Sequence, residues 1–142
     1  MIKRTRIKAT LAEGFKVEAQ ARKHKIVMDL PAPLGSDTGP TPVDVLLASL
    51  AGCIGIVARY HAQKHSIEIK NMSITVEAEY DTAGFEGQDV KPGLLNVNVI
   101  VEVESPNSED EIKKFIEFVE KHCPIEDTLE SETPVKTTVI KK

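Results

Sequence analysis

Residues 41–58 read Thr-Pro-Val-Asp-Val-Leu-Leu-Ala-Ser-Leu-Ala-Gly-Cys-Ile-Gly-Ile-Val-Ala, and the fold depends on this stretch. After its first two residues, only Asp44 and Ser49 are polar. A helix that is apolar on nearly every face has to be buried all round. The stretch therefore predicts a central core helix, and it places Cys53, one of the chain's two cysteines, inside that helix.

The start of this helix carries a clear signal. Thr41 is suited to the N-cap, Pro42 to the first helical position, and Asp44 falls at the third, as in a capping box. We expect the helix to end near Lys64 or His65.

Small residues recur four apart in the same stretch, in the pairs Ala48/Gly52 and Ala51/Gly55. Glycine costs a helix about 1 kcal/mol relative to alanine, so its presence indicates the close approach of another backbone. A chain this small has little else with which to cover such a helix. We therefore predict a homodimer with Cys53 near the contact. The alternative is a monomer in which the sheet and a second helix provide the cover.

Length and composition favour one ordinary globular domain over residues 1–142. A chain of this size buries roughly two thirds of the surface that it exposes when unfolded. The charged fraction of 28% and hydrophobic fraction of 41% are typical of soluble proteins, and the absence of Trp predicts an aliphatic core.

Charge and segment lengths exclude several classes of partner. The net charge is −4, and the basic residues 1–30 and acidic residues 102–132 are best explained as two solvated faces, so no nucleic acid is expected. No secretory signal is recognisable, which predicts a cytoplasmic protein. The apolar run ending at Ala58 is shorter than the roughly 20 residues of a membrane span, so no membrane is expected. In that compartment, two cysteines are free thiols or a working redox pair.

The remaining pattern predicts an α+β domain with antiparallel sheets around the central helix. The expected order is βββ-α-ββ-αα-β, with strands near residues 2–11, 15–19, 24–28, 66–81, 94–103 and 135–140. A loop is expected at 82–92. An amphipathic helix is expected after a cap at Ser105 or Asn107, followed by one or two turns over residues 125–130.

Two interpretations compete for the cysteines. A thiol in an apolar helix is most often an inert core residue, which is the composition-based interpretation of Cys53. Cys123 precedes Pro124, which suits the start of a short helix, and a thiol at a helix N-terminus has a lowered pKa to which His122 would add. The two thiols form a plausible disulfide pair, although their spacing does not show that they meet.

The histidines offer a metal site as an alternative. His61 and His65 have the spacing of a two-histidine ligand set, which Cys123 or His122 would complete as a zinc site. No Cys-x-x-Cys motif and no intervening glutamate support it. We therefore favour a solvated helix end, with no metal and no cofactor.

The combined motif resembles the OsmC/Ohr family, the osmotically inducible and organic hydroperoxide resistance proteins. The resemblance covers essentially the whole chain and is carried by the run from Gly39 to Cys53, by His-Cys-Pro-Ile at 122–125, and by Thr128-Leu129. It implies an intertwined homodimer with active sites at the subunit interface and a thiol-dependent peroxidase activity. By position, Cys53 matches the cysteine that attacks the peroxide and Cys123 the resolving cysteine.

The same resemblance implies organic hydroperoxide substrates and a dithiol reductant, lipoyl-linked in better known members. Two departures place the chain in the OsmC-like branch. Val43 stands where the hydroperoxide resistance branch has a glutamate, with Asp44 one step later as a candidate catalytic group. No arginine occupies a matching motif position, so Arg22 is the candidate activating cation. The alternative function is a non-catalytic dimer that binds a small apolar or thiol-containing ligand in the interface pocket.

Overall fold

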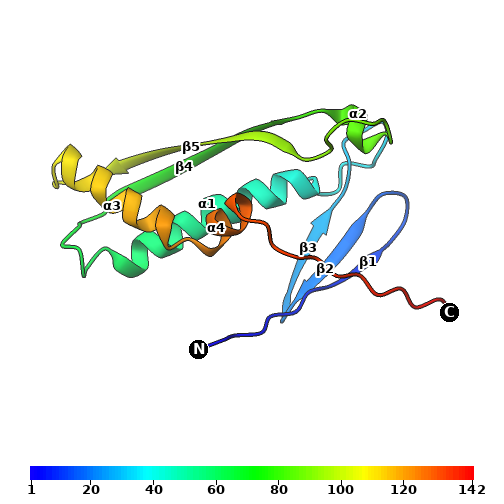
Figure 1. Ribbon diagram of the computed structural model, residues 1–142, viewed down its shortest axis with the longest axis horizontal. Coiled ribbons are helices and arrows are strands. Elements are labelled where there is room, and N and C mark those ends of the chain that lie inside the picture. The colour runs from blue at the N-terminus through cyan, green and yellow to red at the C-terminus, as the bar shows by residue number, and fades with distance from the viewer. The chain divides into compact units, whose positions relative to one another are not determined.

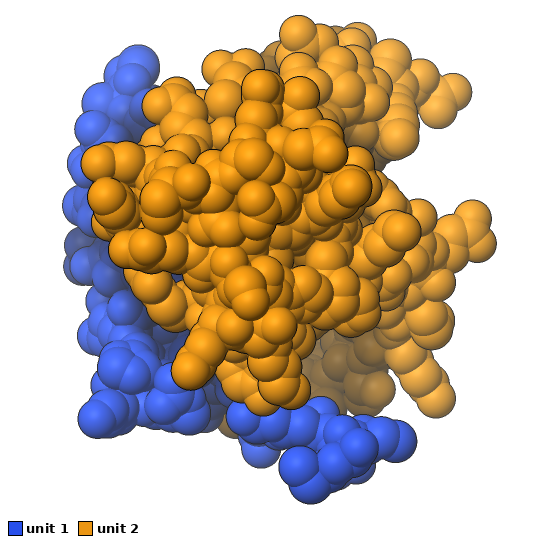
Figure 2. Space-filling model, turned by 90° about the vertical axis from the view of Figure 1, so that its left-hand side faces the viewer, with its two compact units in different colours: residues 1–48 blue, residues 49–142 orange.

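The computed structural model describes residues 1–142, the whole sequence. Its elements are, in chain order (Figure 1), β1 (Lys8–Leu11), β2 (Val17–Ala21), β3 (His24–Met28), α1 (Pro42–His61), β4 (Asn71–Tyr80), α2 (Thr82–Phe85), β5 (Leu94–Glu104), α3 (Glu109–Lys121) and α4 (Pro124–Glu130). They form two compact units, residues 1–48 and 49–142 (Figure 2). The α+β class is confirmed, whereas a single domain over residues 1–142 stays a prediction.

The first unit contains the predicted three-stranded antiparallel sheet, in the order β1-β2-β3. The β2–β3 hairpin pairs Val17 with Met28 and Ala21 with His24. The first strand is shorter than expected, because Lys8 pairs with Gln20 and β2 ends one residue further on. Residues 2–7 therefore have no strand beside them to pair with.

The loop between β3 and α1 is organised by a buried carboxylate. The Asp29 side chain is only 2% exposed and accepts hydrogen bonds from Leu30 N (2.7 Å), Thr38 N (3.1 Å) and Thr38 Oγ1 (2.7 Å). These bonds, with that from Thr38 Oγ1 first, hold the pKa of Asp29 below its ordinary value. A Cβ at Gly39 would collide with the carbonyl oxygen of Val27, so only glycine lets the loop return past β3.

Helix α1 begins with the predicted capping box. Thr41 Oγ1 accepts from Asp44 N at 3.1 Å, and Asp44 Oδ2 accepts from Thr41 N at 3.0 Å. After His61, turns continue to Ser66. The φ of Ser66 is 55°, which lies in the left-handed region. Ile67 N donates to Ala62 O (2.9 Å) and Ser66 N to Gln63 O (3.1 Å), as in a Schellman motif. Helix α1 itself ends at His61, earlier than the predicted end near Lys64 or His65, which falls in these turns.

The second unit contains the long hairpin of β4 and β5, which confirms the predicted strand pair. Ile74 lies opposite Val101 and Val76 opposite Val99, so one face of the hairpin is aliphatic. Strand β4 starts at Asn71 rather than Ser66, because the end of α1 and its connection occupy the preceding residues. Within the predicted loop, α2 forms one turn over Thr82–Phe85, capped by the Asp81 carboxylate.

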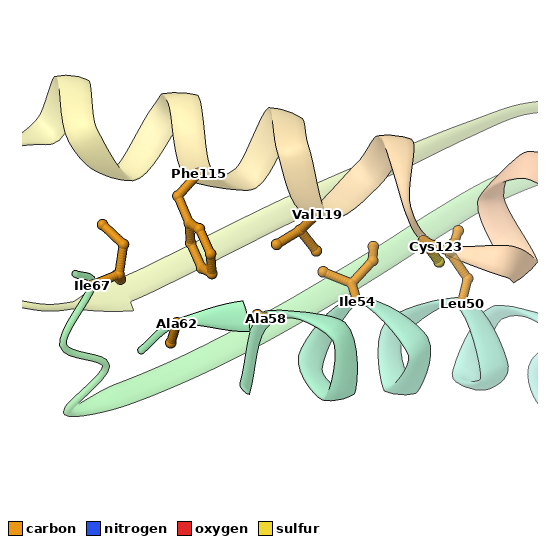
Figure 3. Packing of buried hydrophobic residues seen from close by; sticks show 8 residues of the cluster. All are labelled: Leu50, Ile54, Ala58, Ala62, Ile67, Phe115, Val119 and Cys123. Carbon is orange, nitrogen blue, oxygen red and sulfur yellow. The ribbon is translucent and has the colours of Figure 1, made fainter. Parts of the chain in front are cut away.

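Helix α3 supplies the other side of the core in this unit. It starts at Ser108 rather than at the predicted caps, because Ser108 and Glu111 form a complete capping box. Asn107 instead ties the turn before α3 to the end of α1, accepting from Glu68 N (2.9 Å) and donating to Ser66 O (2.9 Å). Figure 3 shows Leu50, Ile54 and Ala58 of α1 facing Phe115 and Val119 of α3, with Cys123 at the end of the row.

The exposure of α1 differs from the prediction of a helix buried all round. Only three of its twenty residues are buried, whereas Ile56 is 72% exposed and Tyr60 is 76% exposed. The helix is also long and apolar enough, at twenty residues, to cross a membrane by length and composition. The expectation that the run is too short is therefore wrong for the helix as folded. The buried face against α3 shows that α1 contributes to a protein core.

The predicted closing strand at residues 135–140 is not formed. No strand follows α4, and Val135, Val139 and Ile140 are all exposed. The segment is rich in β-branched residues, but strand propensity takes effect only where a neighbouring strand offers hydrogen bonds. No strand of the chain pairs with residues 135–140.

The buried Asp29 predicts a specific loss of stability in acid. Its pKa is lowered by folding, so its contribution is present above the unfolded value of about 3.9 and is lost as the pH falls toward the folded pKa. Asp29→Asn should lower the urea midpoint at pH 7, because an amide NH₂ cannot accept from Thr38 N. Urea unfolding of both proteins between pH 7 and pH 3 measures the difference between their urea midpoints. That difference should become smaller below about pH 4. A difference independent of pH would contradict this role.

Candidate active site

The second unit brings Cys53 and Cys123 together. Cys53 lies on α1, is half-buried, and packs against the core cluster beside Leu50 and Ile54. Cys123 lies at the junction of α3 and α4 and is 0% exposed. The Cys53 side chain lies close enough to Cys123 to raise the pKa of its thiol. Seventy residues apart in the sequence, the free thiols are direct neighbours in the fold.

The local structure fixes the Cys123 sulfur. Cys123 is the N-cap of α4, and its Sγ accepts a hydrogen bond from Glu126 N at 3.4 Å. Pro124 occupies the first position of the helix, as predicted. The chain turns sharply here because α3 ends at Lys121 and Pro124 cannot continue it.

The electrostatics of Cys123 differ from the prediction. Burial is the main cause that raises the pKa of the Cys123 thiol, and the neighbouring Cys53 side chain raises it further. The backbone N–H groups of Glu126 and Ile125 act in the opposite direction but are weaker. The predicted lowering by the helix N-terminus is thus real in sign and outweighed by burial. Cys123 is a protonated thiol at neutral pH.

His122 does not serve the thiol as expected. Its ring stacks on Phe118 with centroids 4.1 Å apart, and its Nδ1 lies 2.8 Å from Phe118 O. The ring of Phe118 also contacts those of His61 (4.9 Å) and His65 (4.3 Å). The imidazoles gather around an aromatic ring rather than around a common point.

This arrangement gives the zinc alternative no support within the chain. No group of three or more His, Cys, Asp or Glu side chains is placed to hold a metal ion. The pKa of His61 is lowered, first by burial and then by the neighbouring His65 and His122. The three histidines therefore form an aromatic contact between the ends of α1 and α3.

The other two predicted residues lie outside the thiol pair. Asp44 caps α1, and its nine-residue separation from Cys53 corresponds to about 13.5 Å of helix rise. Arg22 is exposed at the tip of the β2–β3 hairpin, where its φ of 53° lies in the left-handed region. Their catalytic roles stay predictions.

Sequence reasoning missed two groups at the site. One is the Glu126 backbone N–H, which the spacing of an N-cap residue and the third helical residue would have indicated. The other is Phe118, whose ring contacts those of His61 and His65. It stands one position before Val119, the last residue of the predicted apolar face of α3. Neither carries a recognisable catalytic motif.

Comparison with known proteins identifies the family. Residues 35–138 match the OsmC family of OsmC-like proteins. The hydroperoxide reductase of Mycoplasma pneumoniae is 34% identical over 139 residues, which cover 98% of this chain and 96% of the relative. The hydroperoxide reductase of Mycoplasma genitalium is 31% identical with the same coverage.

Solved structures agree with this assignment. The crystal structure of an OsmC-like protein from Mycoplasma pneumoniae superposes with a TM-score of 0.82 at 34% identity, covering 92% of this chain and 89% of the other. A hydroperoxide resistance protein OsmC from Legionella pneumophila, at 18% identity, shares the fold with a TM-score of 0.65 and covers 91% of this chain and 90% of its own. The chain is a member of the OsmC-like protein family.

Proposed function

We propose that this protein is a cytoplasmic thiol peroxidase that reduces organic hydroperoxides through a Cys53/Cys123 cycle. The neighbouring pair of free thiols, half-buried Cys53 beside buried Cys123, is the observation that carries the proposal. Two relatives of full-length similarity are named hydroperoxide reductases, which supports a role in peroxide resistance.

The exposure of the two thiols and the pKa of Cys123 support a role for Cys53 as the attacking cysteine and for Cys123 as the resolving cysteine. Cys53 is the more exposed thiol, so a peroxide reaches it first. Cys123 is fully buried and held in its protonated form, which suits a residue that reacts only with a neighbour. The surrounding apolar side chains, among them Leu50, Val57 and Ile125, favour an organic hydroperoxide over hydrogen peroxide.

The proposed chemistry has two oxidative steps and one reductive step. The Cys53 thiolate attacks the terminal peroxide oxygen, which breaks the O–O bond, forms a sulfenic acid and releases an alcohol. The Cys123 thiol then displaces water from that sulfenic acid and closes the disulfide. A dithiol reductant, which we expect to be lipoyl-linked, restores both thiols by exchange and leaves as its own disulfide.

Peroxide turnover by cysteine variants tests the roles of the two thiols. With cumene hydroperoxide and dihydrolipoamide, Cys53→Ser should lower the rate by a factor of roughly 100 or more, because the nucleophile is lost. Cys123→Ser should still consume one peroxide per chain but lose dithiol-driven turnover. Val90→Glu, in the exposed loop after α2, is the control that leaves both thiols and should keep the wild-type rate.

Equal turnover by the wild type and Cys53→Ser would overturn the proposal. An inactive wild type that copurifies with a small ligand, seen by native mass spectrometry, would favour the ligand-binding alternative.

We also propose that Arg22 activates Cys53 across a dimer. A non-glycine residue in the left-handed region costs about 1–2 kcal/mol, and such outliers concentrate at functional sites. Keeping arginine where glycine would relieve the backbone is the observation in its favour.

Arg22→Gly should therefore be at least as stable as the wild type while its Cys53 reacts more slowly with cumene hydroperoxide. Competitive kinetics and thermal melts measure the two effects separately, and Lys23→Gly is the matched control at the next hairpin position. An unchanged rate in Arg22→Gly would remove the residue from the mechanism.

The exposed face of α1 leads us to propose a homodimer. Ile56 and Tyr60 are mostly exposed, and the mostly apolar helix buries only three residues within one chain. A second copy would cover this face and offer a sheet edge to the unpaired residues 135–140. The second copy would bury the exposed apolar side chains of α1 that a membrane would otherwise have to surround.

Sedimentation equilibrium should give twice the chain mass for the wild type. Ile56→Glu should shift the equilibrium toward monomer, because it places a charge in the proposed contact. Val90→Glu, an equally apolar to acidic change in the loop after α2, should stay dimeric. A monomeric wild type, or one that floats with phosphatidylcholine vesicles, would contradict the dimer.

A further inference from the structure

The sulfur atom that caps the short helix α4 is also the one that the proposed peroxidase cycle oxidises to a disulfide. The N-terminus of the helix is capped by Cys123 Sγ, which accepts from Glu126 N at 3.4 Å. The same sulfur neighbours the Cys53 side chain, which acts on its pKa. One atom therefore belongs both to the reactive pair and to the first turn of α4.

Beyond this cap, Thr128 Oγ1 donates to Pro124 O (2.7 Å), Ser131 Oγ donates to Asp127 O (2.6 Å), and the acidic first turn complements the positive end of the helix. It has seven residues, none of them buried, and helices of this length are marginal without outside support. Ile125 is its contact with the core cluster. Its last turn has no basic residue, while Glu130 places a negative charge at the negative end of the helix.

Repulsion between carboxylates adds to this weakness. Burial, followed by the nearby charges of Glu120 and Glu130, raises the pKa of Glu126. Burial, with Glu130 and Glu117 next, likewise raises the pKa of Glu120 at the end of α3. The acidic side chains of the α3–α4 junction therefore oppose the packed arrangement that the cap maintains.

Closing the disulfide changes the capping atom in two ways. The sulfur has to move from a hydrogen-bonded position to about 2.05 Å from the Cys53 sulfur. It also loses its S–H proton and remains a weak acceptor as a half-cystine sulfur. The displacement of the sulfur therefore weakens the bond from Glu126 N.

We propose that α4 is a redox-gated cover that is ordered over the reduced pair and loosens when the Cys53–Cys123 disulfide forms. This inference rests on the proposed function, because an organic hydroperoxide supplies the two electron equivalents of oxidation. Cys123 is completely buried, so while α4 is in place a dithiol reaches the disulfide only at the half-buried Cys53 sulfur, and a loosened α4 gives it a second approach, at Cys123. Loosening α4 opens that approach only when there is a disulfide to reduce.

Hydrogen exchange of the α4 amides tests the proposal. After one equivalent of cumene hydroperoxide, intact mass should show the loss of two hydrogens, and exchange over residues 125–130 should rise about fivefold, as expected for loss of an N-cap. Cys123→Ala should show the faster exchange without oxidant. Cys123→Ser keeps a capping oxygen and should stay protected with and without oxidant.

A second pair of variants tests the consequence for reduction. Glu130→Lys should stabilise α4 by complementing the helix end, and should slow reduction of the disulfide by dithiothreitol several-fold. Glu132→Lys makes the same charge change beyond the helix and should reduce at the wild-type rate.

The outcomes separate the cover from the catalytic cycle. A disulfide that forms with unchanged exchange over residues 125–130 overturns the cover and leaves the peroxidase proposal intact. Equal reduction rates for Glu130→Lys and Glu132→Lys also overturn it. Absence of any disulfide after oxidation overturns both proposals.

Discussion

Packing of α1 against α3 is the constraint on which the site depends. Leu50, Ile54 and Ala58 form one row on α1, and Phe115 and Val119 meet them from α3 (Figure 3). Each buried aliphatic side chain of this kind contributes about 1.5–3 kcal/mol relative to exposure. The row ends at the point where α3 stops, and the next buried residue along it is Cys123. The sulfur contact with Cys53 is thus a product of core packing, with no ion pair or metal required to bring the thiols together.

The same packing explains why the two cysteines differ. Burial keeps the Cys123 thiol protonated, whereas Cys53 sits nearer to solvent on the opposing helix. A buried neutral partner is less prone to react with peroxide by itself, because the thiolate is the nucleophile. In the proposed cycle, this difference sets the order of the reaction: the outer thiol meets the oxidant and the inner thiol meets the oxidised product. The cap that Cys123 provides to α4 would extend this order to the reductive step.

Local rules were sufficient for much of the fold and for the identity of the two thiols. The capping box of α1, the β4–β5 pair and the position of Pro124 follow from residue spacing alone. The pKa of Cys123 does not, because burial by Val119, Ile54 and their neighbours depends on tertiary packing. The predicted strand at 135–140 is absent and Ile56 is exposed, because residue spacing alone does not show whether a partner strand or a covering surface is available. The histidine spacing suggested a metal, but the side chain of Phe118 decides what those rings contact.

The central claim is that Cys53 is oxidised first and that its contact with Cys123 resolves it. Trapping with dimedone, which labels sulfenic acids, tests this claim directly. After one equivalent of cumene hydroperoxide, peptide mass spectrometry should find a dimedone adduct on Cys53 in Cys123→Ser. The wild type should show the Cys53–Cys123 disulfide and little adduct. An adduct on Cys123 in Cys53→Ser, or equal labelling of Cys53 in the wild type and in Cys123→Ser, would contradict the account.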